Sequence, residues 1–153
     1  MNHQSQQTIA DEIHHSHSNL NRLLEEIEAH AVTLGIVRED RASILEELEQ
    51  YTRQFGDEIL GHMADEEANL FEWLAAHLAK SQQPQIARLL DQHRELEGLL
   101  EELAVAIGLC LERPDSDSRI RDVNDHVRLL KYAFFAHINQ ERLLLERVNI
   151  MER

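Results

Sequence analysis

The sequence predicts an all-α protein, an up-down-up-down bundle of four helices. Apolar residues recur every three or four positions along most of the 153-residue chain, which is the period of an amphipathic helix. Helix-breaking residues are few, with five glycines and two prolines, and strand-like alternation of Val, Ile and Thr is absent. Amphipathic helices joined by short loops pack as such a bundle. The length suits one domain over residues 1–153, with residues 1–7 as a disordered tail.

The first helix is expected from about Ile9 to Leu34. Thr8 followed by Asp11 resembles a capping signal at its start, and Gly35 suits the position just past its end. Its inward positions step by four and three residues: Ile13, His17, Leu20, Leu24, Ile27, Ala31 and Leu34.

The second helix is expected to start near Ile44, because Ser43 and Glu46 form a capping box. We expect it to end near Trp73, with Leu74–Gln83 turning away as a connecting segment. Its inward positions are Ile44, Leu48, Tyr51, Phe55, Ile59, His62, Glu66, Leu70 and Trp73.

The third helix is expected to begin at Pro84, which fits a first turn. A loop over residues 113–118 separates it from the fourth helix. The inward positions of the third helix are Ile86, Leu89, His93, Leu96, Leu100, Leu103 and Ile107. Those of the fourth are Val123, Val127, Leu130, Phe134, His137, Glu141, Leu144 and Val148.

Charge and composition exclude several classes of function. The chain carries 15 basic and 29 acidic residues, a net charge of −14, which repels nucleic-acid backbones and anionic membrane surfaces. A single cysteine, Cys110, excludes an internal disulfide and a cysteine-based metal cage, and we expect it to be an inert buried thiol. The start of the chain lacks the features of a signal peptide, so a cytoplasmic protein is expected.

Six polar residues occupy inward positions that a core would fill with apolar side chains: His17, His62, Glu66, His93, His137 and Glu141. Burying an unpaired imidazole or carboxylate lowers the stability of the fold by several kcal/mol, so these six side chains need partners that offset this cost. A bound metal ion is one such compensation.

Loop lengths place the four histidines in one layer of the bundle. His17 and His62 lie nearly equal numbers of residues from the loop that joins their helices, and so do His93 and His137. The middle pair reaches the same height only if Leu74–Gln83 does not extend the second helix.

Glu66 and Glu141 lie one turn beyond His62 and His137, so each His-x-x-x-Glu pair presents both groups on one face. Four imidazoles and two carboxylates suit a pair of first-row metal ions, which two carboxylates can bridge. The sequence therefore predicts a pair of first-row ions: iron and manganese both suit these ligands, and zinc is possible but usually takes only four.

The segments His62-Met-Ala-Asp-Glu66 and His137-Ile-Asn-Gln-Glu141 resemble the two His-x-x-x-Glu motifs of hemerythrin-like (HHE cation-binding) domains. His93 is similar to the third-helix histidine of that family, and His17 to its first-helix histidine. The resemblance implies that Glu66 and Glu141 bridge a di-iron centre that the histidines complete.

The chain also departs from that pattern. Glu97 stands where oxygen-carrying members have a second third-helix histidine, and His14 or Glu97 are the candidates to fill the gap. The resemblance implies a protein that senses, stores or responds to oxygen, nitric oxide or iron, with a small diatomic ligand. No protein partner or oligomeric state follows from the sequence.

Two other classes of function remain open. One is a metal-free acidic helical module that binds a protein partner through one face. The other is a di-iron oxidase or peroxidase, which ranks low because Glu12-Ile-His-His15 is the only Glu-x-x-His match and has no counterpart. An enzymatic activity is therefore left undecided, with a non-enzymatic role favoured.

Overall fold

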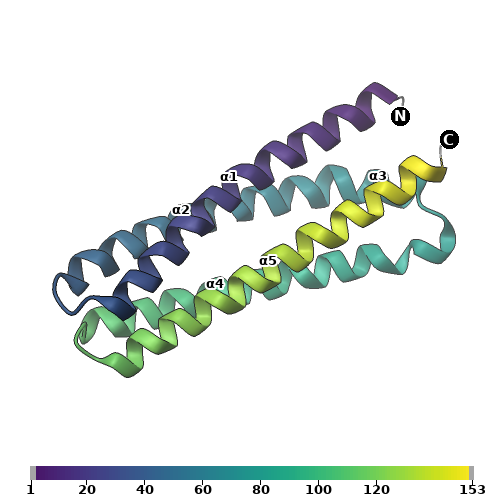
Figure 1. Cartoon of the computed structure of the whole chain (residues 1–153). Coiled ribbons are helices and arrows are strands. Elements are labelled where there is room, and N and C mark those ends of the chain that lie inside the picture. The colour runs from purple at the N-terminus through teal and green to yellow at the C-terminus, as the bar shows by residue number, and fades with distance from the viewer. Residues whose placement is uncertain (1–2, 152–153) are drawn as a thin grey trace.

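The computed structural model describes the backbone of residues 3–151 and the side chains of residues 11, 13 and 15–148. Four helical rods run up and down along one axis (Figure 1). Helices α1 (His3–Ile36), α4 (Pro84–Glu112) and α5 (Asp117–Met151) form three of them. The fourth consists of α2 (Arg41–Asp65), the π-helical turn η1 (Glu66–Leu70) and α3 (Phe71–His77). The predicted all-α four-helix bundle is confirmed.

The two ends of the bundle differ in the loops and chain termini that lie there. The α1–α2 and α4–α5 loops lie at one end, and both chain termini and the α3–α4 connection lie at the other (Figure 1). That connection contains the short 3-10 helix η2 (Lys80–Gln82). Within the described residues, the structure contains no helix long and apolar enough to cross a membrane.

The core is divided into two apolar clusters. The larger one is built from all four rods and includes Leu24, Phe55, Leu103 and Phe134. The smaller one lies toward the termini and includes Trp73 and its neighbours on α3, α4 and α5. The six inward polar residues lie between the larger and the smaller cluster along the bundle, so apolar packing encloses them from both sides.

The first rod is longer than the sequence predicted. Helix α1 begins at His3, so residues 3–7 are helical rather than a disordered tail, while residues 1–2 lie outside the described part. No proline or glycine interrupts this stretch. The helix also passes through Gly35 and ends at Ile36, so the predicted glycine cap is wrong.

The start of the second rod also differs from the prediction. Helix α2 begins at Arg41, after Asp40 in the left-handed conformation with φ 60°, and makes no capping box at Ser43. Arg41 is buried, its Nε donates to the Val37 carbonyl at 2.8 Å, and its Nη1 lies 3.2 Å from Asp117. A buried contact with another helix therefore fixes this start.

The second rod does not end near Trp73. It continues to His77, because Leu74 is fully buried in the smaller cluster and holds another turn in helical form. The connection begins only at Leu78 and Ala79, which are extended, so it is shorter than the predicted Leu74–Gln83.

The sequence did not predict the π-helical turn η1 within the second rod. The Phe71 N–H bonds to the Glu66 carbonyl five residues earlier, where an α-helix would use four. The extra residue lets Glu66, Leu70 and Phe71 all face the interior. π-helical turns of this kind are frequent at functional sites.

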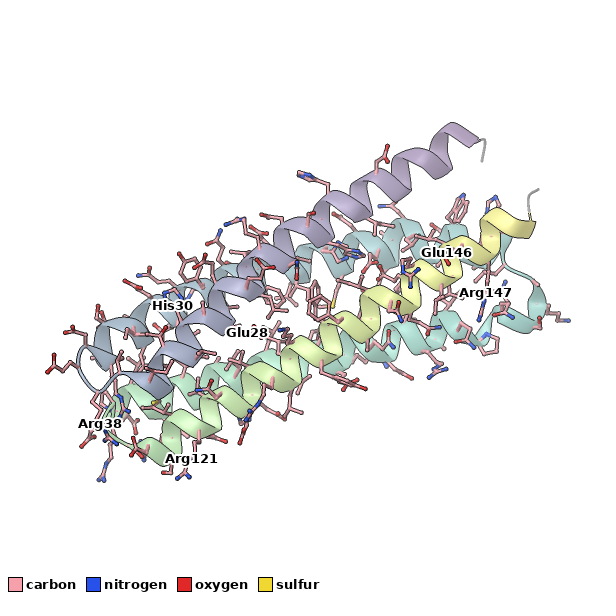
Figure 2. The ribbon with its side chains drawn as sticks, in the orientation of Figure 1. Glu28, His30, Arg38, Arg121, Glu146 and Arg147 are labelled. Carbon is pink, nitrogen blue, oxygen red and sulfur yellow. The ribbon has the colours of Figure 1, made fainter. Side chains whose placement is uncertain are left out.

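Polar contacts on the outside tie neighbouring rods together. Lys131 on α5 lies 2.6 Å from Glu28 on α1. Figure 2 shows Glu28 and His30 among the side chains of the bundle. His30 on α1 is half-buried, contacts Glu47 on α2 at 2.9 Å and packs against Tyr51. Cys110 is buried as predicted, and burial raises the pKa of its thiol.

Candidate metal centre

All four rods contribute to one polar layer in the interior. The residues that meet there are His17 from α1, His62 from α2, Glu66 from η1, His93 from α4, and His137 and Glu141 from α5. Helical spacing predicts that all six face inward, and loop lengths predict that the four histidines lie at one height. Glu66, His93, His137 and Glu141 are each at most 2% exposed.

The six residues form two groups of four that could each hold a metal ion. His17 and His62 complete the first group, and His93 and His137 complete the second. Glu66 and Glu141 belong to both groups. In each group the ligand atoms lie within 4.8 Å of one another. This sharing of two carboxylates is what a pair of bridged ions requires.

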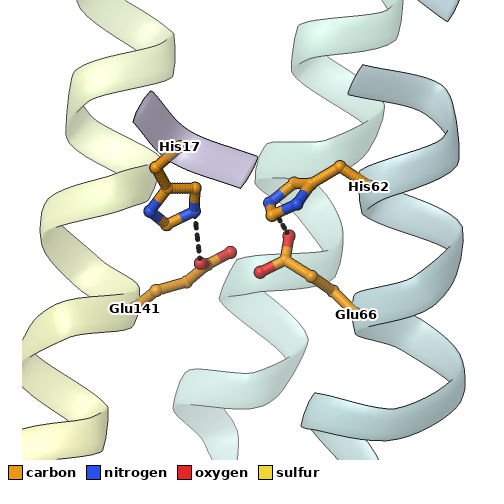
Figure 3. Close-up of side chains that lie close together, drawn as sticks. All are labelled: His17, His62, Glu66 and Glu141. Atoms are coloured by element: carbon orange, nitrogen blue, oxygen red, sulfur yellow. Dashed lines mark ion pairs between the residues drawn. The ribbon is translucent and has the colours of Figure 1, made fainter. Parts of the chain in front are cut away.

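In the first group the carboxylates point toward one another between the two imidazoles (Figure 3). His17 Nε2 lies 3.2 Å from Glu141 Oε2, and His62 Nε2 lies 3.0 Å from Glu66 Oε1. The two rings approach edge to face, with centroids 5.0 Å apart.

The second group is more compact and more deeply buried. His93 Nε2 lies 3.1 Å from both Glu66 Oε1 and His137 Nε2. His137 Nε2 also contacts Glu141 Oε1. Phe71 stacks on the His93 ring with centroids 5.1 Å apart, so the turn that carries Glu66 also covers this side of the layer.

Three of the histidines have a polar partner at their outer nitrogen. His137 Nδ1–H donates to Gln92 Oε1 at 2.8 Å, and His62 Nδ1 lies 2.7 Å from the Ser16 hydroxyl. His93 Nδ1 lies 3.5 Å from Glu67 Oε1. Such partners fix the ring orientation and direct the lone pair of Nε2 toward a metal ion.

The sequence did not predict these three partners of the outer histidine nitrogens. Ser16, Glu67 and Gln92 each adjoin one of the six residues in the chain, but each contacts a histidine on a different rod. Helix periodicity says which side chains face inward, and it does not say which neighbour completes a contact across the bundle.

Charge interactions in the layer oppose one another. Burial raises the pKa of Glu141, and the neighbouring Glu66 adds to this, so that it reaches about 8. Burial also acts to raise the pKa of Glu66, but close polar contacts with Glu141, His137, His62 and His93 outweigh it and lower that pKa well below its usual range. For His137, close contacts with the Glu141 and Glu66 carboxylates outweigh burial and raise its pKa to about 9.

Several buried atoms of the layer have no hydrogen-bond partner. Among the described residues these include His62 Nε2, Glu66 Oε2 and both carboxylate oxygens of Glu141. They lie close to neighbouring ligand atoms, but not in hydrogen-bond geometry. Buried polar atoms left in this way are costly, and a cation among them would satisfy all of them together.

The donor atoms also indicate which metals fit. Imidazole nitrogen and carboxylate oxygen are ligands that suit iron and manganese, and zinc binds the same groups in four-coordinate sites. With four protein ligands in each group, an iron ion keeps positions for outside ligands. The residues present therefore fit a pair of first-row ions.

Of the two further candidate ligands, Glu97 does not join the layer. Glu97 is exposed and lines a groove between α2 and α4, with Thr52 and Leu100 on its walls. The side chain of His14 lies outside the described residues. The gap left by the absent third-helix histidine is therefore not filled by Glu97.

Comparison with known proteins agrees with this geometry. A family model described as Hemerythrin HHE cation binding domain matches residues 8–148, which include all six residues of the layer. No curated protein and no solved structure matched the chain. Because the match covers most of the sequence, the chain belongs to the hemerythrin HHE cation-binding family.

Proposed function

We propose that the protein binds two non-haem iron ions through His17, His62, Glu66, His93, His137 and Glu141. The loaded centre then senses, stores or responds to oxygen, nitric oxide or iron. A pair of iron ions supplies redox chemistry and open positions for a small diatomic ligand. The protein supplies the cage, the fixed imidazole orientations and the apolar packing that excludes water on both sides.

One observation carries the proposal: Glu66 and Glu141 belong to both four-residue groups. A single ion would leave two of the four histidines without a role. A metal-free interaction module would leave buried carboxylate oxygens unsatisfied, at a cost that apolar side chains would avoid. Family membership supports cation binding independently.

Each residue has a distinct part in the proposed centre. Glu66 and Glu141 would serve both ions, His17 and His62 would hold one of them, and His93 and His137 would hold the other. Ser16, Glu67 and Gln92 hold three of the imidazoles in place through their outer nitrogens.

Metal analysis of anaerobically purified protein tests the proposal. Mass spectrometry should find close to two irons per chain, and the near-ultraviolet absorption should change when air is admitted. His137→Ala should lower the iron content, whereas His126→Ala should not, because His126 contacts Asp122 and Glu102 at the surface. Failure to take up iron in iron-replete conditions would overturn the proposal.

A further inference from the structure

A groove between α1 and α5 leads from the surface to the metal layer. Its volume is about 410 Å³, and its inner end is formed by His17 and Glu141. Its walls are mainly apolar, with Ile13, Phe135 and Leu145 among them. Polar residues such as Ser18 and Asn21 also line it. Pockets that hold small organic molecules have this size and combine apolar walls with polar groups that orient the ligand.

The groove is much larger than a diatomic ligand needs, since one water molecule takes up about 30 Å³ of liquid. Its walls also belong to the fold: Ile13 and Leu145 pack against the smaller core cluster, and Ile138 packs against the larger one. Phe135 is 41% exposed and forms one wall of the groove. A large apolar side chain exposed at the surface is often part of a binding site.

The charge at the inner end decides the head group of the ligand. Two divalent cations carry twice the positive charge that Glu66 and Glu141 neutralise, so a loaded layer attracts an anion. At the rim, Arg142 Nη1 lies 2.9 Å from Glu146 Oε1 and its Nη2 donates to Asn139, so this guanidinium is already paired. The attraction for an anionic head therefore comes from the loaded layer.

A second groove reaches the layer from the other side of α1, and it suits such a ligand less well. Its volume is about 320 Å³, and Asp65 and Asn69 line it beside His62 and Glu66. Among the described residues that line this groove, no Arg or Lys accompanies Asp65, whereas Glu146 in the α1–α5 groove is paired with Arg142. Ile13 and Leu70 are the apolar residues that line it, and they offer little surface to a hydrocarbon chain. The α1–α5 groove is the better fit.

From these observations we propose that the α1–α5 groove binds a small monocarboxylate with an aliphatic chain. The carboxylate lies at the inner end, beside His17 and Glu141, and the chain lies along Ile13, Phe135 and Leu145. This inference rests on the proposed function, because the loaded metal pair provides the charge that holds the carboxylate.

Titration calorimetry of iron-loaded, anaerobic protein with sodium octanoate tests the inference. Octanoate should bind at least about tenfold more tightly than acetate, which has the same head and no chain, because each buried methylene adds affinity. Octanol, with the same chain and no charge, should also bind at least about tenfold more weakly. Equal affinities for octanoate and acetate, or for octanoate and octanol, would overturn the inference.

A matched pair of variants locates the site. Phe135→Ala should weaken octanoate binding about fivefold, since it removes one apolar wall. Tyr132→Ala should leave the affinity unchanged, because Tyr132 is 78% exposed on the same helix and does not line the groove. Equal effects of the two variants would place octanoate elsewhere and overturn the assignment.

Iron content measured on the same samples distinguishes failure of the groove assignment from failure of the proposed metal centre. Protein that holds two irons but does not distinguish octanoate from acetate overturns the groove assignment and leaves the metal centre intact. Protein that takes up no iron overturns both. Octanoate binding equally well to metal-free protein would show that the loaded layer does not hold the carboxylate, which also contradicts the inference.

Discussion

His62 illustrates how one residue can cost stability in one state and supply it in another. Its Nε2 is buried without a hydrogen-bond partner, although Glu66 Oε1 lies only 3.0 Å away. In metal-free protein Nδ1 bonds with the Ser16 hydroxyl, but Nε2 loses its hydration without gaining a bond. In loaded protein the same nitrogen becomes a ligand. Substitutions at this residue should therefore have opposite effects in the two states.

We expect His62→Leu to stabilise the metal-free protein by about 1 kcal/mol, which corresponds to a rise in Tm of about 2–4 °C. The same variant should bind less metal and lose most of the stabilisation that iron gives the wild type. Thermal denaturation with iron and with a chelator measures both effects. A fall in Tm under chelation would show that the imidazole contributes to the metal-free fold, contrary to this account.

Gln92 gives a second test at the residue scale, because it holds His137 without itself being a ligand. Gln92→Leu removes the acceptor for His137 Nδ1 and should weaken metal binding about 10–100-fold. Competition with a chelator of known affinity measures this change. Gln85→Leu is the control, since Gln85 accepts a similar bond from Gln140 on α5 outside the layer. Equal losses in the two variants would mean that Gln92 acts only on helix packing.

The residues of the layer were predictable from sequence, whereas their supporting contacts were not. Regular steps of three and four placed His17 and His137 inward, and loop lengths placed them at one height. The metal-ligating roles of these residues stay a prediction. Ser16 and Gln92 act across the bundle, and their contacts depend on helix rotations that no sequence spacing encodes.

At the scale of helices, the ends were the least predictable parts. Pro84 marked the start of α4 correctly, because its fixed φ suits a first turn. Gly35 and Ser43 gave misleading signals, because buried contacts of Arg41 set the turn between α1 and α2. The predicted end near Trp73 came from matching the heights of the histidines, and burial of Leu74 instead continues the rod to His77.

Arg41 allows a test of that explanation. Arg41→Ala removes a buried guanidinium that bonds to the Val37 carbonyl and contacts Asp117 on α5. It should lower the free energy of unfolding by about 1–3 kcal/mol, since the part-buried bond to the Val37 carbonyl and the contact with Asp117 are both lost. Denaturant titration of metal-free protein measures the change.

The matched control is Arg38→Ala. Arg38 also faces Asp117, at 3.8 Å, but its side chain is 79% exposed, so the free energy of unfolding should change by less than about 0.5 kcal/mol. Both variants should still take up iron. The α1–α2 loop lies at the end of the bundle away from the smaller cluster, and neither arginine belongs to the polar layer. Equal destabilisation by the two variants would contradict the role given to burial.

At the scale of the whole molecule, the polar layer couples folding to metal binding. It joins residues from all four rods between two apolar clusters, so an ion bound there links every rod to the others. The unfolded chain has no preformed site, and binding therefore stabilises the fold. The net charge of −14 adds to this effect, because bound cations reduce repulsion among the acidic groups.

Iron should therefore raise the Tm of the metal-free protein. At a free concentration of 100 times the Kd, one site contributes about 2.7 kcal/mol and raises Tm by about 5–11 °C. Differential scanning calorimetry under argon measures the shift, and a chelator should reverse it. Mg²⁺ is the control for nonspecific charge screening, because it prefers oxygen ligands and retains its water, and it should shift Tm by much less. Equal shifts with Mg²⁺ and Fe²⁺ would mean that screening of the acidic surface, rather than ligation by the buried imidazoles, stabilises the bundle.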